Sequence, residues 1–224
     1  MHLEYTPEQE QLRAEMRATL ERVMTPERLA AIGDNIEGGP AVRDTVRALA
    51  QADLLGVGWP KEYGGRGFSA IEQFIFSEEA RRVGAPIPLV TLNTVGPTLM
   101  QQGTEEQKQR FLPAILDGSV EFAIGYSEPG AGSDLASIRT TAVRDGDEYV
   151  INGQKMFTSG AAYADYIWLA VRTDPNVKKQ GHFDPHRAHF VAGFLLATPA
   201  HHARHLHLLH VLRQRPGPGQ RPRR

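Results

Sequence analysis

The sequence predicts an α+β protein in which an all-helical N-terminal domain over residues 1–120 precedes an incomplete antiparallel β-domain over residues 121–179. Three observations support this prediction. Apolar residues recur at helical spacing through the first half, the spacing changes to alternation from Glu121 on, and the composition breaks sharply near residue 180. A chain of 224 residues with 41% hydrophobic residues is large enough to bury a core.

Helix starts in the first half are marked by capping boxes, in which a Ser or Thr and a Glu or Gln three residues later satisfy the free amides of a first turn. The pattern occurs at Thr6–Gln9, Ser69–Glu72 and Thr104–Gln107, and Pro7 takes the first helical position, which proline favours. We expect helices to begin at these three sites and a further helix to begin near Pro40.

Apolar residues at helical spacing predict the buried face of each helix. They are Leu12, Met16, Leu20 and Val23 in the first helix, Val42, Val46, Leu49 and Ala50 in the second, Ile71, Phe74, Ile75 and Val83 in the third, and Phe111 and Leu112 in the last. We expect the second helix to end near Gly56 and the third at Gly84, and a short apolar helix over residues 95–100. The glycine-rich segment at 59–69 predicts a turn.

Alternating apolar and polar residues predict β-strands from Glu121 on. The stretch EFAIGYS at 121–127 predicts a first strand, and the Asp-Gly pair at 145–146 predicts a hairpin turn between two short strands. The Asn-Gly pair at 152–153 predicts another turn, and ADYIWLAVRT at 164–173 predicts a long strand. We expect these strands to form an antiparallel sheet.

Composition limits the class of protein. The chain has no cysteine, which excludes disulfides, thiolate catalysis and cysteine-ligated metals, and which fits a cytoplasmic location. The acidic, polar N-terminus resembles neither a secretory signal nor a transit peptide, and no window reaches the ~18 uninterrupted apolar residues of a membrane helix. We expect a cytoplasmic protein without a membrane span.

The stretch SEPGAGSD at 127–134 is the first candidate for a ligand-binding loop. Its glycines do not have the spacing of the dinucleotide-binding fingerprint, and no helical pattern follows them. Small residues let backbone amides approach an anionic or planar ligand, and Ser133 adds a hydroxyl donor. An ordinary tight turn is the alternative interpretation.

Four stretches, taken together and in order, resemble the acyl-CoA dehydrogenase family of flavoproteins. They are GWPKEYGGRG at 58–67, GTEEQKQRFLP at 103–113, YSEPGAGSD at 126–134 and DEYVINGQKMFTSGAAYADY at 147–166. The resemblance spans residues 1–179. It implies an N-terminal helical domain, a middle β-domain and a C-terminal four-helix bundle, with FAD bound between the last two.

The resemblance implies cofactor-binding roles for six residues. They are Tyr126 and Ser127 on a flavin-contacting strand, Ser133 at the end of the glycine loop, where its hydroxyl contacts the flavin pyrophosphate or the acyl-CoA substrate, and Phe157, Thr158 and Ser159 on a returning strand beside the isoalloxazine ring. The family usually has Thr at 127 and 159 and Trp at 157, so this chain keeps a hydroxyl or an aromatic ring at each position. Glu128, Pro129 and Gly130 are interpreted as residues that shape the loop.

The implied reaction is FAD-dependent dehydrogenation of an acyl-CoA thioester, in which a carboxylate removes the α-proton while a hydride leaves the β-carbon for the flavin. Electron-transfer flavoprotein is the implied electron acceptor, and a homo- or hetero-oligomer is the implied assembly. The catalytic base of the family belongs to the four-helix bundle, so no catalytic residue is assigned in this chain, and we expect its activity to be impaired. A non-catalytic subunit of a heteromer, an acyl-CoA oxidase and a flavin monooxygenase are the alternative functions.

Residues 180–224 form a tail of different composition, with eight of the nine histidines, seven arginines, no lysine and a single acidic residue, Asp184. Three interpretations of the tail each lack a supporting feature. A metal site at His201 and His205 lacks acidic ligands, a nucleic-acid arm lacks aromatic residues for base stacking after Phe194, and a membrane-surface helix lacks a clean apolar face. We expect neither a bound metal nor a nucleic-acid partner.

The fourth interpretation of the tail is a change of reading frame after about residue 179. Synonymous codons for residues 180–218, read one base later, allow a translation that contains GISILIVP and ends on VRVP, which resembles the family's continuation at this point. We therefore expect the tail to be disordered, the four-helix bundle to be absent, and the strand at 164–172 to be left as an unpaired edge.

Overall fold

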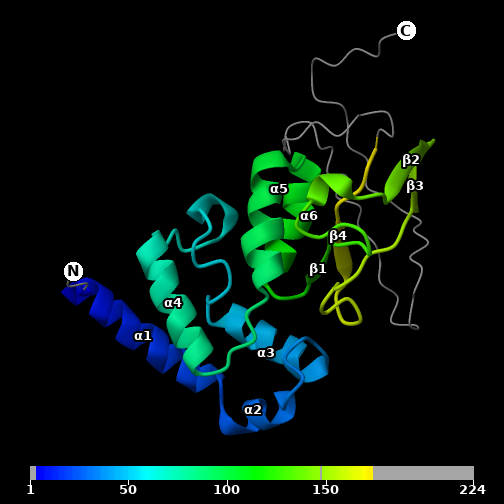
Figure 1. The fold of residues 1–224 in the computed structure, drawn as a ribbon. Helices are drawn as coiled ribbons and strands as arrows, with labels where there is room; N and C mark the ends of the chain where they lie inside the picture. The colour runs from blue at the N-terminus through cyan, green and yellow to red at the C-terminus, as the bar shows by residue number, and fades with distance from the viewer. Residues whose placement is uncertain (1–3, 147, 174–224) are drawn as a thin grey trace. The chain divides into compact units, whose positions relative to one another are not determined.

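A computed structural model describes residues 4–146 and 148–173 of the chain. The chain divides into two compact units, a helical unit that runs to Glu121 and a β unit that begins at Phe122 (Figure 1). The predicted tail at 180–224 lies outside the described residues. In the described part of the chain, no helix is both long and apolar enough to cross a membrane.

The helical unit consists of α-helices joined by turns (Figure 1). They are α1 (Pro7–Val23), α2 (Pro26–Ile32), α3 (Pro40–Gln51), α4 (Ala70–Arg82), α5 (Gly96–Gln102) and α6 (Glu105–Leu116), with a 3-10 turn, η1, at Lys61–Tyr63 and a π turn, η2, at Thr91–Val95. The three predicted capping boxes are confirmed at the starts of α1, α4 and α6. The sequence pattern misses α2, although Thr25 and Pro26 repeat the Thr-Pro start of α1.

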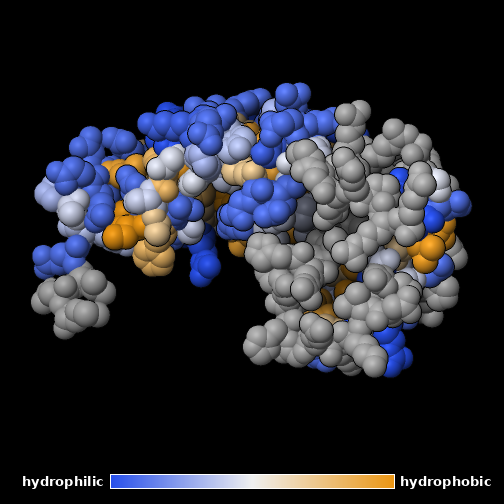
Figure 2. Space-filling model, turned by 90° about the horizontal axis from the view of Figure 1, so that it is seen from above, coloured by the Kyte–Doolittle hydropathy of each residue, from blue (hydrophilic) through white to orange (hydrophobic). Residues whose placement is uncertain are grey.

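The predicted buried faces are confirmed in part. Met16 and Leu20 of α1 are buried, as are Val42, Val46 and Leu49 of α3, which ends at Gln51, earlier than predicted. The prediction is wrong for Ile71 and Phe74 of α4, whose exposed fractions are 52% and 55%. On the face of the molecule that Figure 2 shows, hydrophobic patches lie among hydrophilic residues.

The buried face of α4 is set by a carboxylate rather than by the predicted apolar stripe. Glu79 is 1% exposed, and it accepts hydrogen bonds from Arg13 Nε at 2.8 Å and from Arg17 Nε and Nη2 at 2.9 Å. These hydrogen bonds, which we call the Arg13–Glu79–Arg17 clamp, hold the Glu79 side of α4 against α1. Ile75 and Phe76 of α4 are buried as well. Ile71 and Phe74 are therefore left on the outer side of the helix.

Trp59 forms a second packing centre of the helical unit. Its side chain is buried, and its Nε1 donates a hydrogen bond of 2.9 Å to the carbonyl oxygen of Leu92 in the π turn. A Cβ added at Gly96 would overlap the indole ring of Trp59, and one added at Gly65 would collide with the carbonyl oxygen and Cβ of Trp59. Glycine is therefore required at Gly65, within the predicted glycine-rich turn, by the backbone of Trp59, and at Gly96 by the indole ring.

The β unit contains two strand pairs. β1 (Phe122–Gly125) and β4 (Tyr166–Leu169) run parallel, whereas β2 (Thr141–Asp145) and β3 (Glu148–Asn152) form an antiparallel hairpin (Figure 1). The core of this unit consists of Ala123, Ala142, Ile151, Ala164, Ile167, Leu169 and Val171. A short 3-10 turn, η3 (Leu135–Ser137), lies between β1 and β2.

The prediction of an antiparallel sheet is confirmed for the β2–β3 hairpin and wrong for the β1–β4 pair. The Asn-Gly pair at 152–153 closes no second hairpin, because residues 153–165 carry the chain to a strand that runs in the same direction as β1. β4 is also shorter than the strand predicted at 164–173.

The expectation of an unpaired strand at 164–172 is wrong on the side that faces β1. All four residues of β4 pair with β1, and Ala170 N donates to the carbonyl oxygen of Gly125 at 3.2 Å. Further on, Arg172 N donates to the carbonyl of Thr140, and Ala142 N donates to the carbonyl of Arg172, each at 2.8 Å. This part of the chain therefore joins both strand pairs.

Candidate functional site

Two segments of the β unit that carry predicted site residues are bonded side by side. Tyr126 and Ser127 directly follow β1, and Met156 N donates a hydrogen bond of 2.8 Å to the carbonyl oxygen of Ser127. The structure therefore brings residues 126–127 and 157–159 together at the end of β1. The prediction that Phe157, Thr158 and Ser159 lie on a strand is wrong, since they belong to the connection between β3 and β4.

Phe157 combines an exposed side chain with an unusual backbone conformation. Its exposed fraction is 81%, the largest among the exposed large hydrophobic residues of the described chain, and its φ angle is +56°. A non-glycine residue in this left-handed region carries backbone strain of about 1–2 kcal/mol, and such strain is concentrated at functional sites. The chain therefore maintains both an exposed aromatic ring and a strained backbone at one position.

The other two predicted residues of this segment sit beside Phe157. Thr158 is partly buried, and its carbonyl oxygen accepts a hydrogen bond of 3.2 Å from Ala161 N. This hydrogen bond closes a turn after Thr158. Ser159 is exposed. One aromatic ring and two hydroxyls thus follow each other along one stretch of chain.

Tyr126 is anchored within the β unit. Trp168 Nε1 donates to its hydroxyl oxygen at 3.1 Å, and burial raises the pKa of this hydroxyl. Its backbone carbonyl accepts a hydrogen bond of 3.0 Å from Lys155 Nζ. Tyr126 therefore presents its backbone and ring edge in a fixed orientation, with its phenol protonated at neutral pH.

The glycine-rich loop, residues 128–140 between β1 and β2, begins with a tight turn. Glu128 N donates to the carbonyl of Ala131 at 2.7 Å, and Ala131 N donates back to the carbonyl of Glu128 at 3.1 Å. Pro129 and Ser133 are exposed. The tight turn that was the alternative interpretation is therefore present, and ligand binding by this loop stays a prediction.

Nothing in the described part of the chain requires glycine at positions 130 and 132 of the loop. A Cβ added at Gly130 or Gly132 would meet no atom within 4 Å, and neither residue has a positive φ angle. Glycine is favoured where the φ angle is positive, where packing is close or where a ligand approaches the backbone. The described part of the chain shows neither of the first two at these positions.

The far end of the loop is fixed to the end of β4. Arg172 Nε donates to the carbonyl of Ile138 at 2.7 Å, and its Nη2 donates to the carbonyl of Ala136 at 2.6 Å. Ser137 Oγ donates to the carbonyl of Asp134 at 2.8 Å. Ser133 is therefore on a loop whose two ends are held.

Glu128, interpreted from the sequence as a loop-shaping residue, is a buried anchor of the site, and Lys155 is its unpredicted partner. Lys155 Nζ lies 2.9 Å from Glu128 Oε1, and their side chains are 2% and 6% exposed. Burial raises the pKa of Glu128, but hydrogen bonds from Lys155 and from residues 139 and 140 outweigh it and lower the pKa to about 2. Burial lowers the pKa of Lys155, and the Glu128 carboxylate opposes that shift.

Both units of the chain match domains of one family. Residues 6–119 match the acyl-CoA dehydrogenase N-terminal domain, and residues 123–205 match the acyl-CoA dehydrogenase middle domain. Two similar proteins from Mycobacterium tuberculosis, each aligned over 179 residues, are acyl-CoA dehydrogenase FadE29, 57% identical, and acyl-CoA dehydrogenase FadE26, 55% identical. The alignments cover 80% and 78% of this chain, and 46% and 44% of those proteins.

Solved structures show the same similarity. The crystal structure of the ChsE4-ChsE5 complex from Mycobacterium tuberculosis is 56% identical with a TM-score of 0.73, and the match covers 78% of this chain and 45% of that one. A structure described as the Tcur3481-Tcur3483 steroid ACAD is 55% identical with a TM-score of 0.74, and covers 80% and 47%. This chain therefore spans about half the length of the relatives it matches.

Proposed function

This chain belongs to the acyl-CoA dehydrogenase family, and from that premise we propose that its β unit supplies the flavin-facing part of an enzyme that dehydrogenates an acyl-CoA thioester. The observation that carries the proposal is Phe157, which is 81% exposed on a backbone with φ +56° and lies beside the chain of Ser127. A protein gains no stability of its own from this arrangement, so a bound planar ligand is its physical reason.

The residues present fit FAD. The open space beside Gly130 and Gly132 lets backbone amides approach a pyrophosphate, and Ser133 adds a hydroxyl next to them. Phe157 offers an aromatic face, and Thr158 and Ser159 offer hydroxyl donors along the same segment. When bound, FAD supplies the acceptor for the hydride that leaves the β-carbon.

The chain's own contribution to this chemistry is to bind and orient. Hydrogen bonds from hydroxyls and backbone amides to the thioester oxygen favour loss of the α-proton, because they stabilise negative charge that develops on that oxygen. Ser133 is the residue we propose for contact with the acyl-CoA. The carboxylate that removes the proton is proposed to come from the four-helix bundle of the family, and electron-transfer flavoprotein is proposed as the electron acceptor, in the cytoplasm.

A fused-ring acyl group is the proposed substrate class. The support is the 55% identity to a structure described as a steroid ACAD. A panel of CoA thioesters tests this, with the chain in its complete assembly and a dye as electron acceptor. We expect faster dye reduction with a steroid side-chain thioester than with a straight-chain thioester, and the reverse order would contradict the substrate class.

A heteromeric assembly is the second candidate, because the similar structures are described as a ChsE4-ChsE5 complex and as Tcur3481-Tcur3483. In this arrangement the chain would pair with a sister chain that completes the site. Co-expression with a sister acyl-CoA dehydrogenase chain from the same genome tests it. A stable, yellow, mixed complex supports the heteromer, whereas a yellow assembly of this chain alone supports the homomer.

Phe157→Gly tests the flavin-binding proposal itself. Glycine accepts φ +56° without strain, so we expect equal or greater stability, while the loss of ring stacking weakens FAD binding by about tenfold. Quenching of flavin fluorescence on titration measures the binding, and Val150→Ala, at another exposed apolar residue of this unit, is the control. Unchanged FAD affinity in Phe157→Gly would remove the observation that supports the proposal.

The tail at 180–224 is proposed to be out of frame. The composition of the tail supports this proposal. The middle-domain match counts against it, because the match runs to residue 205, beyond the proposed frame change near residue 179. The nucleotide sequence across codons 175–185 and downstream decides the matter. A hidden frame encoding the family's helices supports the proposal, and a gene in register through residue 205 refutes it.

A further inference from the structure

The buried ion pair between Glu128 and Lys155 has no role in the function described so far. Each partner belongs to a different part of the candidate site: Glu128 begins the glycine-rich loop, and Lys155 lies two residues before Phe157. Lys155 and Glu128 are far apart in the sequence, so no local element holds them together. Their contact is made by tertiary structure alone.

We propose that Glu128 and Lys155 are positioning residues, which fix the spacing between the glycine-rich loop and the segment that carries Phe157. The proposal rests on the proposed function, because the fixed spacing is the distance between the two parts of a flavin-binding surface. Neither residue is proposed to touch the flavin or the substrate.

Lys155 joins two neighbouring positions of the first segment. Its Nζ donates to the carbonyl of Tyr126 at 3.0 Å and to Glu128 Oε1 at 2.9 Å. The next residue, Met156, donates its backbone amide to Ser127 at 2.8 Å. Residues 155 and 156, which come directly before the strained Phe157, therefore donate hydrogen bonds to each of residues 126, 127 and 128.

Glu128 joins the two ends of the loop. Its Oε2 accepts a hydrogen bond of 2.6 Å from Arg139 N, and its Oε1 accepts one of 2.9 Å from Thr140 N. These amides lie just before β2, at the far end of the loop from Glu128 itself. One carboxylate therefore holds the start of the loop, the end of the loop and the Phe157 segment.

An ion pair suits this task better than apolar packing does. Burial of two charges contributes little net stability, and apolar replacements are often as stable, so a buried pair is weak evidence of a stabilising role. Charge-assisted hydrogen bonds are directional and short, which fixes distances between the groups they join. Strained residues such as Phe157 persist only where the surrounding structure determines their position strongly.

The test compares Lys155→Met, Glu128→Gln and the double variant with the wild-type chain. Lys155→Met leaves Glu128 with its two backbone donors, whereas Glu128→Gln leaves a buried ammonium ion without its counter-charge. The double variant removes both charges, so it avoids the unfolding that an unpaired buried charge could cause. Arg144→Met, at an exposed cation on the hairpin of the same unit, is the matched control. Trp168 fluorescence reports that the β unit is folded.

Hydrogen exchange without flavin is the first measurement. In Lys155→Met we expect the amide of residue 156 to exchange about tenfold faster, and in the double variant the amides of residues 131 and 139 as well, while amides of the β2–β3 hairpin are unchanged. Arg144→Met is expected to exchange like wild type. Wild-type exchange at all three amides in folded variants would overturn the proposal.

FAD titration is the second measurement, and it separates positioning from local stability. We expect the affinity for FAD to fall by about tenfold in the variants with faster exchange. Faster exchange with unchanged FAD affinity would overturn the positioning role. If wild type binds no FAD, the proposed function fails, and the exchange measurement still decides whether the pair couples the two segments.

Discussion

Glycines in the helical unit and glycines in the loop of the β unit are used for opposite reasons. In the helical unit, a Cβ at Gly65 or Gly96 would collide with Trp59. In the loop, a Cβ at Gly130 or Gly132 would meet no atom within 4 Å. The first pair is therefore explained by the protein's own packing, whereas nothing in the described part of the chain explains the second pair.

Buried carboxylates show the same contrast. Glu79 holds α1 and α4 together through Arg13 and Arg17, whose side chains are about one third exposed. Glu128 instead bonds a lysine that is 2% exposed and two backbone amides. The first carboxylate connects two helices by their side chains, and the second fixes backbone segments that carry predicted ligand contacts.

Glu79→Gln is expected to have the largest effect on stability. It leaves the guanidinium groups of Arg13, Arg17 and Arg82 without their counter-charge, and breaking a buried ion pair costs about 3 kcal/mol. Urea unfolding followed by Trp59 fluorescence measures it, in a Trp168→Phe background, because the chain has two tryptophans and each unit holds one.

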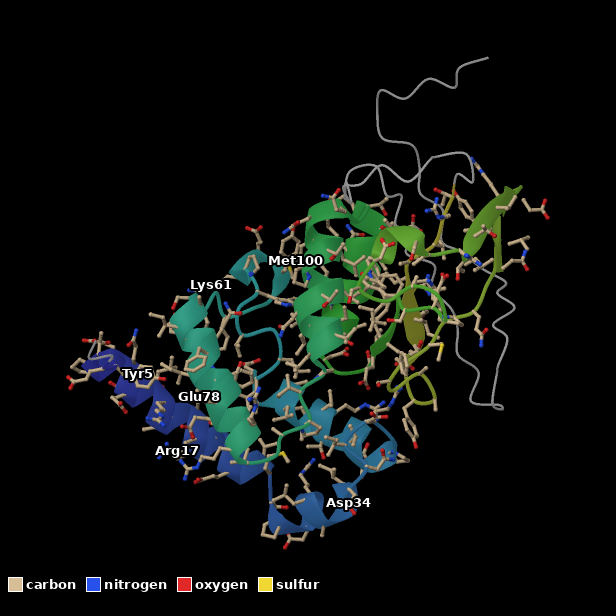
Figure 3. All side chains as sticks on the ribbon, in the orientation of Figure 1. Tyr5, Arg17, Asp34, Lys61, Glu78 and Met100 are labelled. Carbon is tan, nitrogen blue, oxygen red and sulfur yellow. The ribbon has the colours of Figure 1, made fainter. Side chains whose placement is uncertain are left out.

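The control for Glu79→Gln is Glu78→Gln on the same helix. Glu78 accepts an exposed hydrogen bond of 3.3 Å from the hydroxyl of Tyr5. Figure 3 labels both residues, together with Arg17 of α1. We expect a change below about 0.5 kcal/mol for this exposed contact. Equal losses of unfolding free energy in the two variants would show that the Arg13–Glu79–Arg17 clamp stabilises the unit no more than the exposed Tyr5–Glu78 contact does.

Gly96→Ala is expected to destabilise the helical unit by about 2 kcal/mol, because the added methyl group overlaps the buried indole of Trp59. The same Trp59 fluorescence measures the loss, and its emission maximum is expected to shift toward longer wavelength if the ring is displaced. Restored stability in a Gly96→Ala, Trp59→Leu double variant, followed by circular dichroism, would identify the clash as the cause. A neutral Gly96→Ala would break the comparison between the two groups of glycines.

Acid is expected to weaken both units. Hydrogen bonds from Arg17 and Arg13 outweigh burial and lower the pKa of Glu79 to about 2, from an ordinary value of 4.5, and the pKa of Glu128 is also lowered to about 2. A lowered pKa stabilises the folded state fully above about pH 4.5, and this contribution is lost as the pH falls from there toward about 2.

The acid prediction separates the two units when it is combined with a variant. In Glu79→Gln, the Trp59 signal should lose much of its pH dependence between about pH 4.5 and about 2, while the Trp168 signal should keep the dependence that Glu128 gives it. Urea midpoints at a series of pH values measure both signals. Loss of pH dependence in both signals would mean that the two tryptophans do not report separate units.

Local features of the fold could be predicted from sequence, and distant contacts could not. Capping boxes at Thr6, Ser69 and Thr104 predict helix starts correctly because the donors and acceptors lie within one turn. The outward face of α4 was mispredicted because the Arg13 and Arg17 contacts with Glu79 come from another helix. Alternation likewise predicts strands without their direction, so the parallel pairing of β1 and β4 could not be derived.

The candidate site shows the same limit. Tyr126, Ser127, Ser133, Phe157, Thr158 and Ser159 stay predictions for flavin contact, and the resemblance that names them comes from motifs. Lys155 was missed and Glu128 was underestimated, because nothing in the sequence pairs two charges on segments that meet only after folding. The position of Lys155, two residues before the predicted flavin contacts at 157–159, is the sequence signal that could have drawn attention to the pair.

Gly130→Ala and Gly132→Ala are expected to have the smallest effect on stability, within about 0.5 kcal/mol, because the methyl group enters open space on a backbone with no positive φ angle. If the space belongs to a ligand, the same variants should weaken FAD binding, because the methyl group keeps the pyrophosphate away from the loop amides. Flavin fluorescence quenching and Trp168-monitored unfolding, measured on the same preparations, give both quantities. Weaker binding without lost stability would place the reason for these glycines outside the chain, whereas lost stability without weaker binding would return it to internal packing, as at Gly96.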